Sequence, residues 1–235
     1  MPRKHLIASA TNKKQQMQAK IWLKLAKEIK AAAKVGGPNI DANPRLKAAV
    51  EKALSNNLSR ESIERNISGA AKDPADLQTL VYECYGPNGS QFIITALTDN
   101  SNRTASNLRG YLGKIQGQIA RANSVKIHFE NKGTFILVKN ANTTEDSILE
   151  CLIEAQDLDI HEHEDNFEVF VSPDSFYTAK EALQKAGFKI HDADIKLVNP
   201  EKVDITDERM LEKVEHFLET CEDDDDIQSV VHNLL

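Results

Sequence analysis

The 235-residue sequence has few cysteines and no long apolar run. Its three cysteines lie far apart and are odd in number, so neither a disulfide framework nor a cysteine metal clip is predicted. No stretch approaches the roughly 20 apolar residues that span a bilayer, and the first residues lack the apolar segment of a secretory signal. We therefore expect a cytoplasmic protein with no membrane partner. The cysteines are Cys84, Cys151 and Cys221.

Catalytic sequence motifs are also missing. There is no glycine-rich loop followed by Lys-Ser/Thr, no G-x-S-x-G, no H-E-x-x-H and no cysteine with an evident histidine partner. His161 and His163 lie two residues apart among acidic side chains, a pattern that could hold a cation, but no third ligand follows at a diagnostic spacing. We therefore predict no enzyme, no metal site and no cofactor.

Positive charge is scarce overall, since the net charge is −7, but it is concentrated at one end. Residues 1–72 carry 15 Lys and Arg against 5 Asp and Glu, whereas residues 131–235 carry 9 against 26. Residues 73–130 carry 5 of each sign. The N-terminal third would attract phosphate and the C-terminal part would repel it, so a nucleic-acid contact is expected at the N-terminus alone.

The N-terminal third shows helical patterns separated by clear start and stop signals. One helix is predicted from Lys13 to Val35, ending at a Gly-Gly-Pro sequence that cannot continue it. Asn43 is a suitable N-cap with Pro44 at the first helical position of a second helix. Ser59 is predicted to start a third. Residues 1–76 are therefore expected to form a basic three-helix domain.

Strand patterns begin at residue 77. Residues 77–85 and 91–97 are predicted to form a hairpin across a Gly-Pro-Asn-Gly turn, followed by a helix to about residue 114 and a strand over 125–129. Residues 134–198 then give the order strand, helix, strand, strand, helix, strand, which is typical of a ferredoxin-like domain. The individual ranges are 134–138, 144–156, 158–163, 167–171, 174–186 and 189–198.

A last helix over 207–220 and a strand over 227–234 have no partners of their own. We expect them to return and complete the sheet begun by the hairpin. The predicted fold class is α+β and multidomain: a three-helix domain (1–76), a middle α+β domain (77–130 with 202–235) and an inserted ferredoxin-like α+β domain, βαββαβ (131–201).

A basic stripe is predicted along the first helix, where lysines recur within about a 120° arc opposite an apolar face at 100° per residue. An ordinary solvated face would mix charges of both signs, and here Glu28 is the single acidic residue, so phosphate binding is favoured over simple solvation. The predicted nucleic-acid-binding residues are Arg3, Lys4, Lys13, Lys14, Lys20, Lys24, Lys27, Lys30, Lys34, Arg45, Lys47, Arg60 and Arg65.

Two further features have competing interpretations. Trp22 could stack on an unpaired base, but its position beside Ile29 on the helical wheel favours core packing. The acidic run from Glu222 to Asp226 is most simply an exposed turn before the last strand. A cation site, or a decoy that masks the basic domain, is the alternative.

Several motifs resemble one known family over nearly the whole chain. They are Gly36-Gly37-Pro38, Asn43-Pro44-Arg45-Leu46, Ile63-Glu64-Arg65, Tyr85-Gly86-Pro87-Asn88-Gly89, Leu97-Thr98-Asp99-Asn100-Ser101-Asn102-Arg103-Thr104, Ser124-Val125 with Phe129, Lys132-Gly133, Asp226, Gln228 and His232-Asn233. In this order they resemble the YebC/PmpR family, which includes the mitochondrial translational activator of cytochrome c oxidase. The resemblance implies three domains, with the C-terminal segment completing the middle one. It also implies regulation of gene expression, either as a DNA-binding transcriptional regulator or as a translation factor that relieves ribosome stalling at proline-rich stretches.

The residues favour translation over transcription. A small basic domain on an acidic body suits an RNA-walled site on the ribosome, with rRNA or tRNA as partner. A DNA-binding transcriptional regulator is the alternative, but lysines position on phosphate and read little sequence. A ligand-responsive or enzymatic protein ranks third. The sequence leaves the oligomeric state undetermined, with a monomer slightly favoured.

Overall fold

The computed structural model describes residues 3–71, 76–140 and 143–235, and the side chains from Met17 onward. The chain divides into two compact units, which are described separately below. One comprises residues 1–124 and 204–230, and the other residues 125–203 and 231–235. No helix among the described residues is long and apolar enough to cross a membrane.

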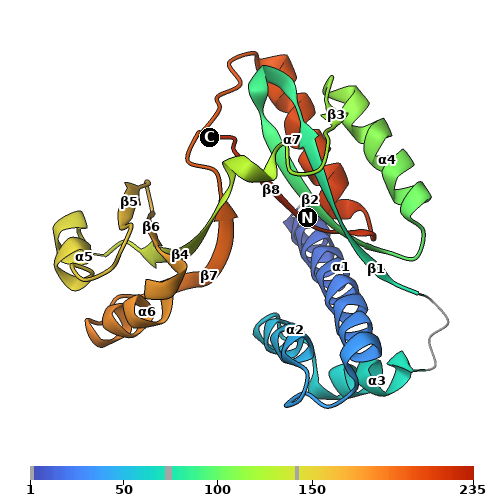
Figure 1. Cartoon of the computed structure of the whole chain (residues 1–235), viewed down its shortest axis with the longest axis horizontal. Coiled ribbons are helices and arrows are strands. Elements are labelled where there is room, and N and C mark those ends of the chain that lie inside the picture. The colour runs from blue at the N-terminus through green and yellow to red at the C-terminus, as the bar shows by residue number, and fades with distance from the viewer. Residues whose placement is uncertain (1–2, 72–75, 141–142) are drawn as a thin grey trace. The chain divides into compact units, whose positions relative to one another are not determined.

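The first unit begins with three helices, α1 (Arg3–Gly36), α2 (Pro44–Ser55) and α3 (Arg60–Ala70). The three predicted helices are confirmed, although α1 begins well before Lys13 because no residue after Pro2 breaks the helical pattern. Figure 1 shows α2 and α3 gathered at the C-terminal end of α1. Their core is apolar, with Leu25, Ile29, Leu46 and Ile63 all buried.

Asn43 joins the end of α1 to the start of α2. Its side-chain oxygen accepts from the backbone N–H of Leu46, as predicted for an N-cap. Its amide nitrogen donates to the carbonyls of Ala32 and Gly37, both at 2.9 Å. A Cβ at residue 36 would lie 2.5 Å from this amide, which explains the glycine at Gly36. One buried side chain therefore satisfies backbone groups at both helix ends.

A four-stranded sheet completes the first unit. The predicted hairpin is confirmed as β1 (Gln78–Tyr85) paired antiparallel with β2 (Gln91–Thr98), joined by the short 3-10 turn η1 (Pro87–Gly89). The strand order is β3-β1-β2-β8, where β3 is Gln118–Ile119 and β8 is Ile227–His232. The helices α4 (Ser101–Lys114) and α7 (Glu208–Asp223) pack together, and Phe217 of α7 meets Phe92 of β2 edge to face at 5.3 Å.

The predicted strand at 125–129 is wrong. Residues Lys126–His128 form the 3-10 turn η2 instead. The alternating pattern suggested one buried strand face, but Ile127 is 78% exposed, whereas Val125 and Phe129 are buried. The two buried residues are four positions apart, which is the spacing of a helical turn and not the two-residue alternation of a strand.

The second unit contains the sheet β5-β6-β4-β7 and two helices. Its elements follow in the order strand, helix, strand, strand, helix, strand. They are β4 (Glu130–Val138), α5 (Glu145–Cys151), β5 (Asp159–Glu162), β6 (Asn166–Val171), the 3-10 turn η3 (Pro173–Ser175), α6 (Phe176–Lys185) and β7 (Ile190–Val198). The helix predicted over 144–156 is wrong beyond residue 151, because the chain leaves the helix at Leu152.

Replacement of Asn43 by alanine should lower the free energy of unfolding by about 2–3 kcal/mol, because an N-cap and two buried hydrogen bonds disappear together. Urea unfolding measures this change. The control is Asn39→Ala, whose side chain accepts one bond from Asp41 in an exposed turn and should cost less than about 0.5 kcal/mol. Equal losses of stability in the two variants would contradict the double-cap role of Asn43.

Candidate nucleic-acid interface

The lysines of α1 from Lys20 to Lys34 lie on the side of the helix away from the buried Leu25 and Ile29. Lys20, Lys24 and Lys27 are spaced at i, i+4 and i+7, which places them on one face. All three are half-buried, although the predicted stripe was interpreted as an open surface. A different segment of the same unit covers them.

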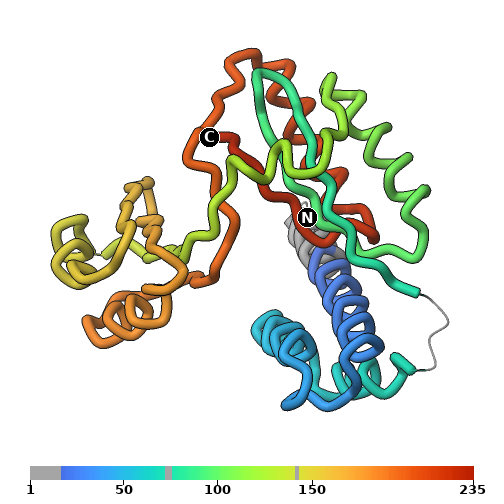
Figure 2. Tube along the Cα trace, viewed as in Figure 1, coloured from blue at the N-terminus to red at the C-terminus, as the bar shows by residue number. Residues whose placement is uncertain are grey.

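The covering segment is the acidic run Glu222–Asp226, which comprises the last two residues of α7 and the turn before β8. Lys20 meets the carboxylate of Asp223 at 2.6 Å. Lys24 donates to the backbone carbonyl of Glu222 at 2.6 Å. Lys27 donates to the carbonyl of Asp225 at 3.1 Å and to the carboxylate of Asp226 at 2.8 Å. In Figure 2 the red turn between α7 and β8 lies beside the blue helix α1.

The turn itself is held in place by local and tertiary bonds. Asp224 accepts from the hydroxyl of Tyr111 at 2.9 Å and from the backbone N–H of Asp226 at 2.8 Å. Burial raises the pKa of Tyr111 to about 12, and the bond to Asp224 adds to this effect. The predicted exposure of residues 222–226 is confirmed for Glu222, Asp223 and Asp225 and is wrong for Asp226, and the run is also anchored on α4 and bonded to α1.

Asp226 is the most strongly bonded member of this run. Its side chain is 8% exposed and accepts from Lys27, from Arg103 at 2.8 Å, from Thr104 at 3.0 Å and from Thr98 at 3.1 Å. Burial alone would raise its pKa, but the bonds from Lys27 and Arg103 outweigh burial and lower the pKa to about 2. The carboxylate therefore stays ionised and joins α1, β2, α4 and β8.

Burial has the opposite effect on Lys24. It lowers the pKa of this lysine, and the nearby carboxylates of Asp224, Glu222, Asp225 and Asp223 oppose that shift without cancelling it. The ammonium group is thus partly removed from water and compensated by an acidic environment.

Other predicted contact residues lie elsewhere on the helical part. Lys34 is 3.9 Å from Asp76, and Lys30 lines a cavity of about 540 Å³ beside Lys24 and Lys27. Arg45 donates to Thr79 at 2.8 Å. The predicted residues Arg3, Lys4, Lys13 and Lys14 lie outside the described side chains.

Three further predicted cations, besides Arg45, are exposed on α2 and α3. Lys47 lies on α2, and Arg60 and Arg65 lie on α3. Arg65 bonds the hydroxyl of Ser62 at a long 3.5 Å on its own helix. These side chains, unlike Lys20, Lys24 and Lys27, need no other segment to move before they can meet a phosphate.

Arg103 is a residue of this site that sequence reasoning did not select. It also pairs with Asp99 at 2.8 Å. Arg103 and Asp226 both belong to motifs of the family resemblance, the first in the motif from Leu97 to Thr104. Nothing in the sequence indicates that these two segments are in contact.

Trp22 is neither a core residue nor a free stacking surface. Trp22 is 38% exposed, so the predicted core packing is wrong. The indole N–H donates to the carbonyl of Asn56 at 2.9 Å, just after α2. Trp22 thus lies at the edge of the contact between two helices, partly exposed to solvent, while its indole N–H is hydrogen-bonded.

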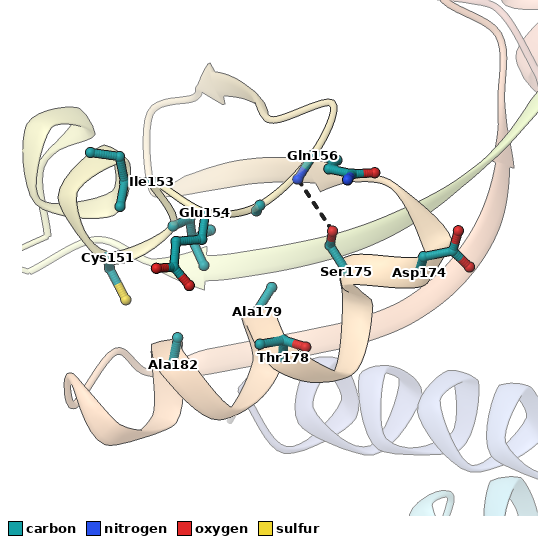
Figure 3. Close-up of a pocket in the computed structure, with 11 residues that line it drawn as sticks. Cys151, Ile153, Glu154, Gln156, Asp174, Ser175, Thr178, Ala179 and Ala182 are labelled. Atoms are coloured by element: carbon teal, nitrogen blue, oxygen red, sulfur yellow. Dashed lines mark hydrogen bonds between the residues drawn. The ribbon is translucent and has the colours of Figure 1, made fainter.

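The second unit has its own cavity of about 440 Å³ between α5 and α6 (Figure 3). Cys151 and Glu154 lie on one side and Thr178, Ala179 and Ala182 on the other, and Ser175 accepts from the backbone N–H of Gln156 at 3.2 Å. The lining offers few converging polar groups, so no binding chemistry is assigned to it.

The two histidines of β5 and its following turn bond within the second unit. His161 lies 3.0 Å from Asp159, and His163 lies 3.6 Å from Glu168. No group of three or more metal-ligating side chains occurs in the part of the chain that the structure describes.

Replacement of Asp226 by asparagine should lower the free energy of unfolding by about 2 kcal/mol at pH 7. The folded pKa of about 2 lies below the ordinary value of 3.8. The contribution is therefore complete above that ordinary value and is lost as pH falls toward the folded value. Urea unfolding should show the difference between wild type and variant falling to about half by pH 3.

The matched control is Asp225→Asn, an exposed neighbour that touches Lys27 through its backbone carbonyl. It should change stability by less than about 0.5 kcal/mol at any pH. A pH-independent cost of Asp226→Asn would contradict the ionic role of this carboxylate.

The chain matches known proteins over its full length. Residues 2–73 match a family model described as the TACO1/YebC protein N-terminal domain, and residues 77–234 match the TACO1/YebC second and third domain. A probable transcriptional regulatory protein of Malacoplasma penetrans is 52% identical over 99% of this chain and 98% of its own length. One of Mycoplasma pneumoniae is 51% identical over 100% of both chains.

A solved structure shares the fold. The crystal structure of a conserved hypothetical protein from Aquifex aeolicus superposes with a TM-score of 0.73 at 34% identity, covering 92% of this chain and 90% of its own. The family matches, the relatives and the motifs from Gly36 to Asn233 all indicate the same family. This chain belongs to the TACO1/YebC family.

Proposed function

We propose that this chain is a regulator of gene expression that binds nucleic acid through its N-terminal helices and is not an enzyme. One observation carries the proposal: an excess of basic residues is confined to residues 1–72 of a chain whose net charge is −7. Phosphate contacts require clustered Lys and Arg, and the rest of the chain would repel a polyanion. The relatives bear the name of probable transcriptional regulatory proteins.

DNA is the first candidate ligand, because the names of these relatives point to transcription. We place the protein in the cytoplasm, with no membrane partner. The domain organisation that we propose for this function is a helical domain (1–76), a middle domain (77–130 with 202–235) and an inserted ferredoxin-like domain (131–201).

Ribosomal RNA is the second candidate, and the amide side chains of the helical part favour it. Gln18 donates to the carbonyl of Asn56, and the amides of Asn56 and Asn66 donate to backbone carbonyls of their own helices. Amides are the side chains that pair with adenine edges in the major groove. Because these three are engaged, the exposed cations would contact phosphate, which suits recognition by shape.

The exposed cations of α2 and α3 give the sharpest test. A triple variant, Lys47→Ala, Arg60→Ala and Arg65→Ala, should weaken binding to duplex DNA at low salt. It should also reduce the slope of log K against log salt by about 0.9 for each phosphate that the variant no longer neutralises. Fluorescence anisotropy measures both quantities. The α1 lysines are left intact because Lys27 also holds Asp226.

The charge-matched control replaces three exposed lysines outside the helical part, Lys185, Lys189 and Lys213, with alanine. Its affinity and salt slope should equal those of the wild type. If both triple variants bind more weakly to the same degree, net charge and not a defined surface governs binding, and the assignment to α2 and α3 fails.

The two ligands are separated in cell lysate. Sequence-dependent retention of genomic DNA fragments, with no ribosome association, would support transcription. Salt-sensitive co-sedimentation with ribosomal fractions in a sucrose gradient would support the second candidate. Absence of both would contradict nucleic-acid binding in either form.

A further inference from the structure

The acidic run Glu222–Asp226 presents oxygens to α1 in the manner of a nucleic-acid backbone. Lys20, Lys24 and Lys27 each receive at least one oxygen, at distances from 2.6 to 3.1 Å. The i, i+4, i+7 row of ammonium groups that would follow a line of phosphates is thus already occupied.

We propose that this run is an intramolecular competitor of nucleic acid, which must displace it from Lys20 and Lys24 before α1 can contribute to binding. The inference rests on the proposed function. Nucleic acid first meets the exposed cations of α2 and α3, and α1 joins the contact when the run moves away.

The bonds at Lys20 and Lys24 are suited to displacement. The Lys20–Asp223 pair lies at the surface, with side chains 44% and 66% exposed, and such pairs contribute little net stability. Lys24 is held by a backbone carbonyl and not by a carboxylate. A phosphate oxygen can replace either acceptor without leaving a buried charge unpaired.

Lys27 differs from these two lysines. Its partner Asp226 is 8% exposed and also bonds Arg103, Thr98 and Thr104. Loss of this pair would leave a buried charge with fewer partners, which is costly. The bonds to Lys20 and Lys24 are therefore replaced first, while the run stays anchored at Asp226. The cavity of about 540 Å³ beside Lys24, Lys27 and Lys30 provides space on the anchored side.

The consequence is selectivity for dense negative charge. A single phosphate cannot replace the several oxygens that the run supplies along α1. A polyanion can, because it offers many oxygens at once and releases condensed counterions when it binds. The apparent affinity of the protein is reduced by the fraction of molecules in which the run covers the lysines.

The test neutralises the exposed carboxylates of the run and leaves Asp226 and Asp224 intact. The variant is Glu222→Gln, Asp223→Asn and Asp225→Asn. Affinity for a mixed-sequence DNA duplex, and separately for ribosomal RNA, is measured by fluorescence anisotropy at fixed low salt. The variant should bind roughly 5- to 30-fold more tightly than the wild type.

The control removes the same charge from α7, at positions before the run. Glu212→Gln, Glu215→Gln and Glu219→Gln replace three exposed carboxylates of α7. If the variants bind more tightly only because general charge repulsion is weaker, both should tighten alike. If the run competes for the lysines, the affinity of the control should stay within about twofold of the wild type. Equal tightening in both variants, or no change in either, overturns the proposal.

Acetylation of lysine amines, measured by mass spectrometry without nucleic acid, tests directly whether the acidic run shields the α1 lysines. Lys20, whose partner Asp223 loses its charge, should react faster in the run variant than in the wild type, while exposed Lys47 reacts at the same rate in both. Equal acetylation rates of Lys20 in the wild type and the run variant would contradict the shielding of this lysine by the run. If neither protein binds nucleic acid but the Lys20 rate still rises, the proposed function and the competition both fail, while the contact between the acidic run and Lys20 is supported.

Discussion

The ionised carboxylate of Asp226 is the contact on which the arrangement of the first unit depends. It receives hydrogen bonds from α1, β2 and α4 while its own backbone leads into β8. A carboxylate this buried is stable only when cationic and hydroxyl donors surround it. The position of the α1 lysines, the path of the acidic run and the join between helices and sheet therefore follow from one charge.

This contact changes how the charge polarity of the chain should be understood. The basic N-terminal part and the acidic C-terminal part are not independent halves, because the run Glu222–Asp226 returns to the helical part. Lys20 and Asp223 are 203 positions apart along the chain and form an ion pair at 2.6 Å. A protein built this way can present its remaining cations, such as those of Lys47 and Arg60, while part of its basic surface is internally neutralised.

Local signals predicted the helical part well. Asn43 and Ser59 both cap the helices that they were expected to start, because an N-cap depends on backbone groups only a few residues away. The strand predicted over residues 125–129 is wrong because burial, unlike an N-cap, depends on distant parts of the chain. Whether Ile127 is buried depends on what the rest of the chain places over it, and Ile127 is 78% exposed.

The amino-acid sequence alone determined the helix caps, the hairpin, the family resemblance and the row of lysines on one face of α1, since each depends on short-range spacing. The tertiary structure decided that Lys20, Lys24 and Lys27 are covered, that Arg103 belongs to the site and that Trp22 lies at an edge. The physical reason is that an ion pair depends on distance in space. No periodicity within α1 can reveal an acidic partner about 200 residues away.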